Sequence, residues 1–317
     1  MRKVRLLPGI LLLLIAAGAA ALLIRFFPCL QGAAFLNQNG DWGRLSFDVT
    51  LKLSEEALSQ EQTAFFDTLA QITGTDKEAL LTLHIRGQSW EELLYFEIIP
   101  GGSEVPLTEL YLGEQQDVVN AAMLYNAVRS NLAGQYELLD LLLPQWSGEE
   151  YMSLEQAGQM LGLDLSWLGD FVLSDYENMF SYWEYFVMLA VMKPERASDG
   201  SQEFSLHTDF AEGEQEKEGS ADLKLRLQKN ADSSVLSAEF EVNNLPMALD
   251  KLDSLLVRMG REESFSEREG LRRIESLAGS LTIGEAHQLQ MPDALMDQDT
   301  VERIAAIRQI LQEMLGR

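Results

Sequence analysis

An uncharged apolar run near the N-terminus constrains this chain more than any other feature. Ile10 to Ile24 contains fifteen residues without a charge, and Leu and Phe residues on either side lengthen the apolar zone. A helix rises about 1.5 Å per residue, so ~20 residues cross the ~30 Å hydrocarbon core of a bilayer. The sequence therefore predicts a transmembrane helix within residues 1–30, in contact with the lipid bilayer through residues 6–27.

The charges beside this run predict its orientation. Arg2, Lys3 and Arg5 precede it, and Pro28 follows it. Cations next to a membrane helix stay on the cytoplasmic side, which leaves the short N-terminus inside the cell. We therefore expect a single-pass protein of the cell membrane whose C-terminal body is extracytoplasmic.

Two other interpretations of the leader also export the body. A signal peptide would have the same charged and apolar regions, and Gly32, Ala33 and Ala34 form an acceptable cleavage site, so cleavage near Ala34 would secrete the protein. The third interpretation is lipidation of Cys29, the single cysteine. Bacterial lipidation sites require a small residue before the cysteine, whereas this chain has Pro28 there.

Charge restricts the partners of the exported part. The chain has 24 Lys and Arg against 50 Asp and Glu, and four of these cations but no acid lie in residues 1–31. The remainder has 20 cations against 50 acids, a net charge of −30. Nucleic acid and anionic bilayer surfaces would repel it, so we expect neither as a partner. With one cysteine, no disulfide forms within the chain.

The exported part begins with a predicted tether and continues as one α+β domain, residues 44–317. Residues 31–43 are rich in Gly, Asn and Gln, which is typical of a tether. In residues 44–53, apolar and polar side chains alternate, which predicts an antiparallel strand with one wet face. Similar alternation or turn composition predicts strands at 79–86, 93–99, 107–112, 204–210, 221–228, 236–242 and 281–291. Gly87-Gln88-Ser89 and residues 100–103 are predicted turns.

Helices are expected between these strands. Apolar stripes at helical spacing predict helices at 54–74, 121–143, 245–259 and at the C-terminus, where Asp299 or a neighbour forms the cap. Ser174 to Glu177 is a capping-box sequence that opens the most apolar helix, and 179–192 has few polar residues. Burial between layers is the first interpretation of this helix. The alternative is an apolar ligand surface made by Trp167, Phe171, Phe180, Trp183 and Phe186.

The order of parts gives a fold and a resemblance. Strands on both sides of a helical middle predict an α+β fold: a curved antiparallel sheet after the transmembrane helix, with helices packed on its apolar, concave face. Together with the segments PLTELYLGEQQDVVNAA and ADLKLRLQKNADSSVLSAEFEV, this order resembles exported bacterial proteins of the LolA/LppX-like type across residues 44–291. The resemblance implies an apolar cavity between sheet and helices that holds acyl chains. This chain lacks their lipidation motif.

Signatures of catalysis and metal binding are absent from the sequence. Motifs for zinc proteases, serine hydrolases, phosphate-binding loops, dinucleotide folds and CxxC redox sites do not occur. His84 and His207 lie on the polar sides of predicted strands, and they and His287 are interpreted as surface histidines. Asp297 and Asp299 lack the glycine and final glutamate of a calcium loop, so helix capping explains them. We therefore expect no enzyme, metal or cofactor.

Two functions remain. The first is a membrane-anchored, extracytoplasmic binding module, not an enzyme, for a lipid or another apolar ligand. The second is a structural or interaction protein of the cell envelope without a small-molecule ligand. The packing between the sheet and the apolar helix near residue 176 distinguishes them, because an open apolar space favours the first and solid packing the second.

Overall fold

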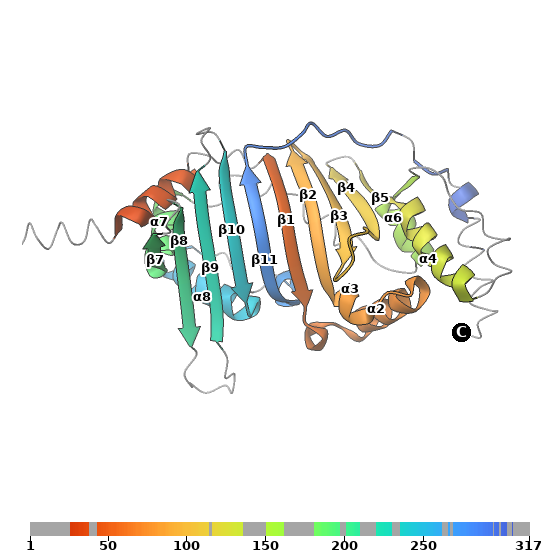
Figure 1. Cartoon of the computed structure of the whole chain (residues 1–317), viewed down its shortest axis with the longest axis horizontal. Coiled ribbons are helices and arrows are strands. Elements are labelled where there is room, and N and C mark those ends of the chain that lie inside the picture. Colours follow the sequence, from red (N-terminus) through yellow and green to blue (C-terminus); the bar gives the residue numbers. More distant parts are fainter. Residues whose placement is uncertain are drawn as a thin grey trace, which may run out of the picture.

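The structure is a computed structural model that describes residues 26–37, 43–113, 116–135, 150–161, 181–196, 201–209, 220–229, 235–261, 266, 269–293, 295–297, 299–302 and 306. These residues form an antiparallel sheet of eleven strands accompanied by helices (Figure 1). The predicted α+β class is therefore confirmed. No helix in the described ranges is long and apolar enough to cross a bilayer. The predicted membrane segment lies, apart from its last residues, outside these ranges.

The sheet consists of two meanders that meet at its centre. The strand order is β6-β5-β4-β3-β2-β1-β11-β10-β9-β8-β7, so β1 pairs with both β2 and β11. We call β2–β6 the N-terminal half and β7–β11 the C-terminal half. The bounds are β1 Arg44–Leu53, β2 Thr82–Trp90, β3 Leu93–Pro100, β4 Thr108–Gly113, β5 Asp117–Asn120, β6 Tyr151–Ser153, β7 Lys193–Arg196, β8 Gln202–Asp209, β9 Ser220–Lys229, β10 Leu236–Asn243 and β11 Ile274–Ile283.

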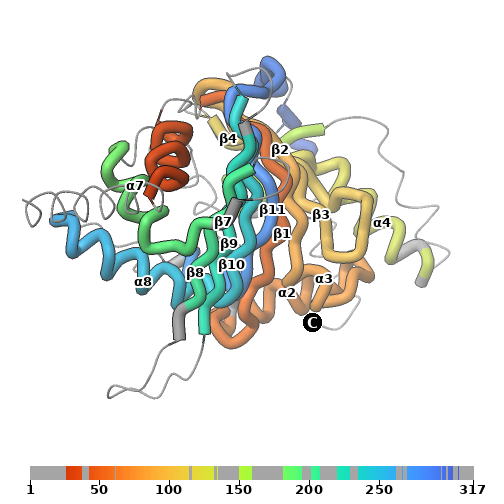
Figure 2. Tube along the Cα trace, turned by 60° about the vertical axis from the view of Figure 1, so that its left-hand side comes forward, coloured from red at the N-terminus to blue at the C-terminus, as the bar shows by residue number. Residues whose placement is uncertain are grey.

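The helices gather at the two ends of the sheet. A helix at residues 26–37, together with α7 and α8, lies on one side of the C-terminal half (Figure 2). The other long helices accompany the N-terminal half (Figure 1). The bounds are η1 Glu55–Ala57, α2 Gln60–Thr73, α3 Lys77–Leu81, α4 Ala121–Gln135, α6 Leu154–Leu161, α7 Tyr182–Val191, α8 Leu245–Arg258 and α9 Glu269–Arg272.

Alternation gives the sheet one apolar and one polar face. In β1, Leu45, Phe47, Val49 and Leu51 point to one face, and the residues between them point to the other. We call these the apolar face and the polar face. The register keeps the alternation continuous across the sheet, because Leu45 pairs with Ile283 of β11, which in turn pairs with Leu236 of β10.

Two groups of buried side chains cover the ends of the apolar face. At the N-terminal end, α6 and the segment near Met296 pack on β3–β6, where Leu112 and Met152 are 0% and 1% exposed. At the C-terminal end, helix 26–37 and α7 pack on β8–β10, where Phe204 is 1% exposed. Burying a side chain of this size stabilises the fold by about 1.5–3 kcal/mol, so these clusters hold the helices on the sheet.

The structure differs from the predicted tether. Residues 31–37, expected to be part of a linker at 31–43, belong to the helix at 26–37, and residues 38–42 lie outside the described ranges. Ala33 is 0% exposed, and a side chain at Gly32 would come within 2.8 Å of Leu189 in α7. Small residues, which suggested flexibility in the sequence, serve here as a close-packed contact between two helices. Pro28 lies within the first turns of this helix and does not end it.

The predicted turn at residues 87–89 is also wrong. Gly87 lies inside β2, where it pairs with Phe47 of β1 and Phe96 of β3. A Cβ atom there would lie 2.2 Å from the carbonyl oxygen of Tyr95, so the close approach of the β3 backbone requires glycine. The turn occurs instead at Glu91, whose φ is +55°.

Other helices and strands begin or end several residues away from their predicted positions. Helix α2 begins after Ser59, which forms a capping box with Gln62, and not at Ser54. Residues 77–81 form the short helix α3, so β2 starts three residues later than predicted. The final strand, β11, spans Ile274–Ile283, whereas the prediction placed it at 281–291.

Candidate functional site

The predicted aromatic ligand surface is described only in part. Trp167, Phe171 and Phe180 lie outside the described residues. Trp183 and Phe186 lie on α7 with their ring centroids 5.7 Å apart, but they face different surroundings. Phe186 is half-buried against the C-terminal cluster, whereas Trp183 is 65% exposed.

The described contact between α7 and the sheet is closely packed. Leu189 of α7 is 2% exposed, and it lies in one cluster with Phe204 of β8 and Leu227 of β9. The thiol of Cys29 donates to the backbone oxygen of Leu189 at 3.5 Å, which joins helix 26–37 to the same contact. Side chains of the protein itself therefore fill the described part of this layer.

The apolar face is covered at one end of the central strands, where Leu45 of β1 and Ile283 of β11 are 4% and 1% exposed, and is less covered farther along them. Val49, Leu51, Leu83, Ile85 and Phe240 are all half-buried, and we call them the central apolar strip. Val49 pairs with Ile85 and Leu51 with Leu83, so four of them form a contiguous block on β1 and β2. Each points to the face that carries the end clusters, and Ile85 also packs against the N-terminal cluster.

Two glycines lie beside this strip on the apolar face. Gly279 of β11 lies between Val49 and Phe240 in the register, and Gly87 of β2 lies beside Phe47. A Cβ atom at Gly279 would lie 2.3 Å from the carbonyl oxygen of Asp48. Neighbouring backbones thus approach closely at both positions, and the Phe47 ring lies over Gly87, 2.8 Å from where a Cβ atom would be.

The polar face carries a ladder of charged and hydrogen-bonding groups. Adjacent positions in the strand register carry five acids, one serine and two arginines: Glu203, Arg226, Glu239, Ser280, Asp48, Arg86, Glu97 and Glu109. We call this set the polar row. Arg86 donates to Glu97 at 2.6 Å, and Arg226 to Glu239 at 3.2 Å.

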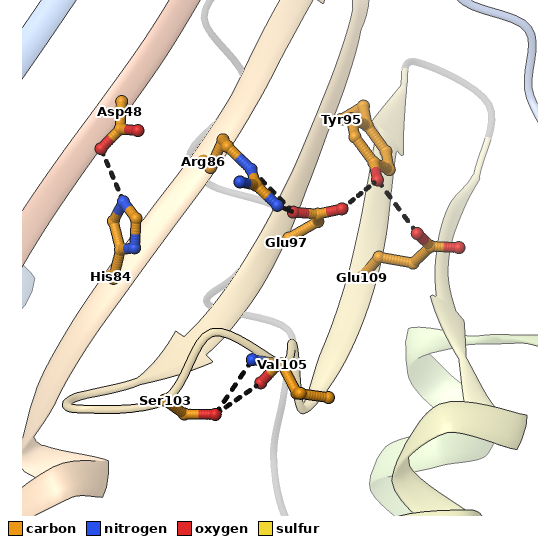
Figure 3. Close-up of polar contacts among 8 residues, drawn as sticks. All are labelled: Asp48, His84, Arg86, Tyr95, Glu97, Ser103, Val105 and Glu109. Carbon is orange, nitrogen blue, oxygen red and sulfur yellow. Dashed lines mark hydrogen bonds and ion pairs between the residues drawn. The ribbon is translucent and has the colours of Figure 1, made fainter.

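The row ends in a tyrosine–glutamate cluster on the N-terminal half (Figure 3). The carboxylate of Glu109 accepts hydrogen bonds from Tyr95 at 3.0 Å, Tyr151 at 2.5 Å and Asn120 at 2.9 Å. Tyr95 also donates to Glu97 at 3.2 Å, which links the cluster to Arg86. Burial, and then the negative charge of Glu109, raises the pKa of Tyr95 well above its ordinary value. The hydroxyl therefore stays protonated and serves as a donor.

The histidines are dispersed. His84 contacts Asp48 at 2.6 Å (Figure 3), His207 contacts Asp222 at 2.6 Å, and His287 is exposed. The interpretation of all three as surface residues is confirmed. Among the described residues, no group of three His, Cys, Asp or Glu side chains is placed to hold a metal ion.

Asp297, a remaining sequence candidate, also has a structural explanation. The side chain of Asp297 accepts from the backbone and hydroxyl of Thr300, both at 2.9 Å, which confirms the capping interpretation. An open hollow of about 370 Å³ lies between α3 and the β3–β4 turn. None of the five predicted aromatic ligand residues is among the residues that line it. Ser103 closes that turn through hydrogen bonds with the backbone of Val105, which is 72% exposed (Figure 3).

Sequence reasoning did not single out the central apolar strip. Its residues alternate in the same way as those at the covered ends, so the pattern carries no signal of coverage. The glycines inside β2 and β11 were the available signal, because an interior glycine marks close backbone approach. No family model, curated protein or solved structure matches this chain.

Proposed function

We propose that this protein is a membrane-anchored, extracytoplasmic binding module that holds a lipid acyl chain or another apolar ligand against the central apolar strip. It performs no catalysis. In this proposal the sheet is curved, with the strip on its concave side, as the resemblance to the LolA/LppX-like type implies. The observation that carries the proposal is the half-buried strip beside closely packed clusters on the same face.

Contiguous apolar surface supports ligand binding. Leu51, Leu83 and Ile85 are half-buried, so each retains some exposed surface. Covering an apolar side chain contributes about 25 cal/mol per Å², so a ligand that lies along the strip gains affinity from every residue. Contiguous exposed apolar surface on a soluble domain is typical of interaction sites.

The packing of helix 26–37 supports an anchor that is not cleaved. Cleavage near Ala34 would remove Cys29 and Ala33, which are 1% and 0% exposed, from the C-terminal cluster. Loss of such side chains from a core costs several kcal/mol. The same burial argues against lipidation of Cys29, because an acylated thiol cannot occupy that contact. We therefore propose that residues 6–27 hold the protein in the cell membrane.

The full chain, purified in mild detergent and examined by native mass spectrometry, tests the ligand. The proposal predicts an added mass that chloroform–methanol extracts as lipid. Val49→Asn should lose this mass because it places an amide on the strip, whereas Thr50→Asn, on the opposite face of the same strand, should keep it. A bare chain mass in the wild type, or equal behaviour of the two variants, would contradict it.

A second function has support from the polar row. Five acids against two arginines on an open face would attract a basic partner surface, which fits a structural or interaction protein of the envelope without a small-molecule ligand. Cross-linking in cells with a lysine-reactive reagent of defined length would test it. Capture of an envelope protein that is lost in Glu239→Lys would favour this second function.

A further inference from the structure

Five aromatic residues gather where helix 26–37 begins and α7 begins. Phe26 and Phe186 have ring centroids 6.0 Å apart. The rings of Trp183 and Phe186 pack edge-to-face with their centroids 5.7 Å apart. The rings of Tyr182 and Trp183 also pack edge-to-face, with their centroids 5.6 Å apart. Phe27 follows Phe26 in the same helical turn. We call these five residues the aromatic end.

The aromatic end is divided between a packed and an exposed part. Phe26, Tyr182 and Phe186 pack against the C-terminal cluster. Phe27 and Trp183 are 54% and 65% exposed, which places them among the most exposed large apolar side chains in the described part of the chain. Tryptophan has a large apolar body and a polar N–H, a combination that favours the boundary between lipid and water.

The aromatic end directly follows the predicted membrane segment in the sequence. One residue, Arg25, separates Ile24, the end of the apolar run, from Phe26. From there the helix at 26–37 is held by the buried Cys29, and Tyr182 donates to the backbone oxygen of Leu30 at 3.4 Å. The described structure thus places a packed helix, where a spacer was expected, directly after the predicted membrane segment in the sequence.

We propose that the aromatic end lies in the interfacial layer of the bilayer that holds the chain's own N-terminal segment, with Trp183 and Phe27 at the level of the lipid headgroups. This inference rests on the anchor in the proposed function. The occupant of the surface is the bilayer itself, because the apolar run ends directly beside it. The negative charge of the body is repelled by anionic lipid, which confines the contact to this uncharged end.

Fluorescence quenching in proteoliposomes tests the contact. The full chain is reconstituted in phosphatidylcholine vesicles with or without bromine atoms high on the acyl chains, which quench nearby tryptophan. The chain has five tryptophans, so the readout is the difference between variants. The quenching by brominated lipid should fall in Trp183→Phe and rise in Phe27→Trp. Trp90→Phe is the matched control, because Trp90 lies on β2 with Arg44 4.6 Å above its ring, and its quenching should match the wild type.

Equal quenching in wild type and Trp183→Phe would overturn the contact. If iodide also fails to reach Trp183 in that case, a protein segment or a second copy covers it, and the inference is wrong for that reason. An alkaline carbonate wash separates this failure from that of the anchor. A chain released by the wash contradicts the anchor and this inference together, whereas a retained chain without quenching of Trp183 contradicts only the inference.

Discussion

The ends and the middle of the apolar face use the same kind of side chain and reach different burial. Leu112 at the N-terminal end is 0% exposed and Phe204 at the C-terminal end is 1% exposed. Leu83 and Val49 in the middle are half-buried, although the strands and the alternation are continuous. Coverage by helices, and not residue type, separates the two regions.

This difference teaches where apolar residues are needed for folding and where they are not. At the ends, side chains from α6, α7 and helix 26–37 fill the space, so each leucine is part of the core. In the middle, a smaller or more polar residue would cost little stability. Ile85 still packs against the N-terminal cluster, whereas Leu51 and Leu83 are the side chains for which the proposed ligand would account.

The largest expected effect contrasts two identical substitutions. Leu112→Ala removes a fully buried side chain and should lower the free energy of unfolding by about 2–5 kcal/mol. Leu83→Ala, on the same face, leaves a smaller cavity and should cost less than half as much. Denaturant unfolding of the full chain in mild detergent measures both. Similar losses would mean that the middle is as much a part of the core as the ends.

A second prediction concerns the glycines of the middle. Gly87→Ala places a methyl group 2.2 Å from the carbonyl oxygen of Tyr95, a backbone atom that cannot move away alone. We expect a loss of about 1–3 kcal/mol, typical of overpacking. Gly134→Ala is the control, because Gly134 lies in α4 with no atom within 4 Å of the added methyl group. It should stabilise by about 0.5–1 kcal/mol. Thermal unfolding ranks the two, and a neutral Gly87→Ala would refute the close approach.

A third, smaller effect involves the charged contact that holds α7 over the C-terminal end. Glu184 contacts Arg261 at 2.6 Å and accepts from the backbone N–H of Ser181 at 2.6 Å. Burial alone would raise the pKa of Glu184, but the hydrogen bonds from Ser181 and the charge of Arg261 outweigh it and hold the pKa below its ordinary value. Glu184→Gln should cost about 1–2 kcal/mol at neutral pH, because the charged hydrogen bond to Arg261 is weakened.

The depressed pKa of Glu184 also predicts how its contribution to stability changes with pH. Because the folded-state pKa is depressed, the stabilisation by Glu184 is complete above the ordinary glutamate pKa of about 4.3 and is lost as the pH falls through the lower folded-state value. The stability difference between wild type and Glu184→Gln should therefore shrink in acid. Glu241→Gln, which removes the exposed pair with Lys224, should change stability much less, because solvent screens that pair. A constant difference for Glu184→Gln at all pH values would contradict the assignment.

The alternation of apolar and polar side chains predicted the sheet well, because it depends only on which face each residue of a strand points to. The strand at Arg44–Leu53 has the predicted bounds, and the faces of β8, β9 and β10 are also as predicted. Glycine was the main source of error. Gly87 and Gly32 have the composition of turns and linkers, but tertiary contacts place one in a strand and the other in a helix contact. Such contacts join residues far apart in sequence, so local composition does not reveal them.

The candidate site was predictable only in outline. The sequence indicated that α7 carries aromatic residues, and Trp183 and Phe186 do lie together. It also placed the expected ligand under that helix, whereas the described contact there is filled by Leu189 and Phe204. The half-buried strip lies on strands whose pattern matches the fully covered ones, because a sequence records which face is apolar and not what packs on it.

Photo-cross-linking in intact cells tests the central claim most directly. A benzophenone amino acid replaces Leu83 on the central apolar strip or, as the control, Arg86, which lies on the polar face of the same strand. The account predicts that irradiation adds a lipid-sized mass to the Leu83 variant and not to the Arg86 variant, as measured by mass spectrometry of the purified chain. No adduct at position 83, or a protein-sized adduct there, would contradict an apolar small-molecule ligand on the strip.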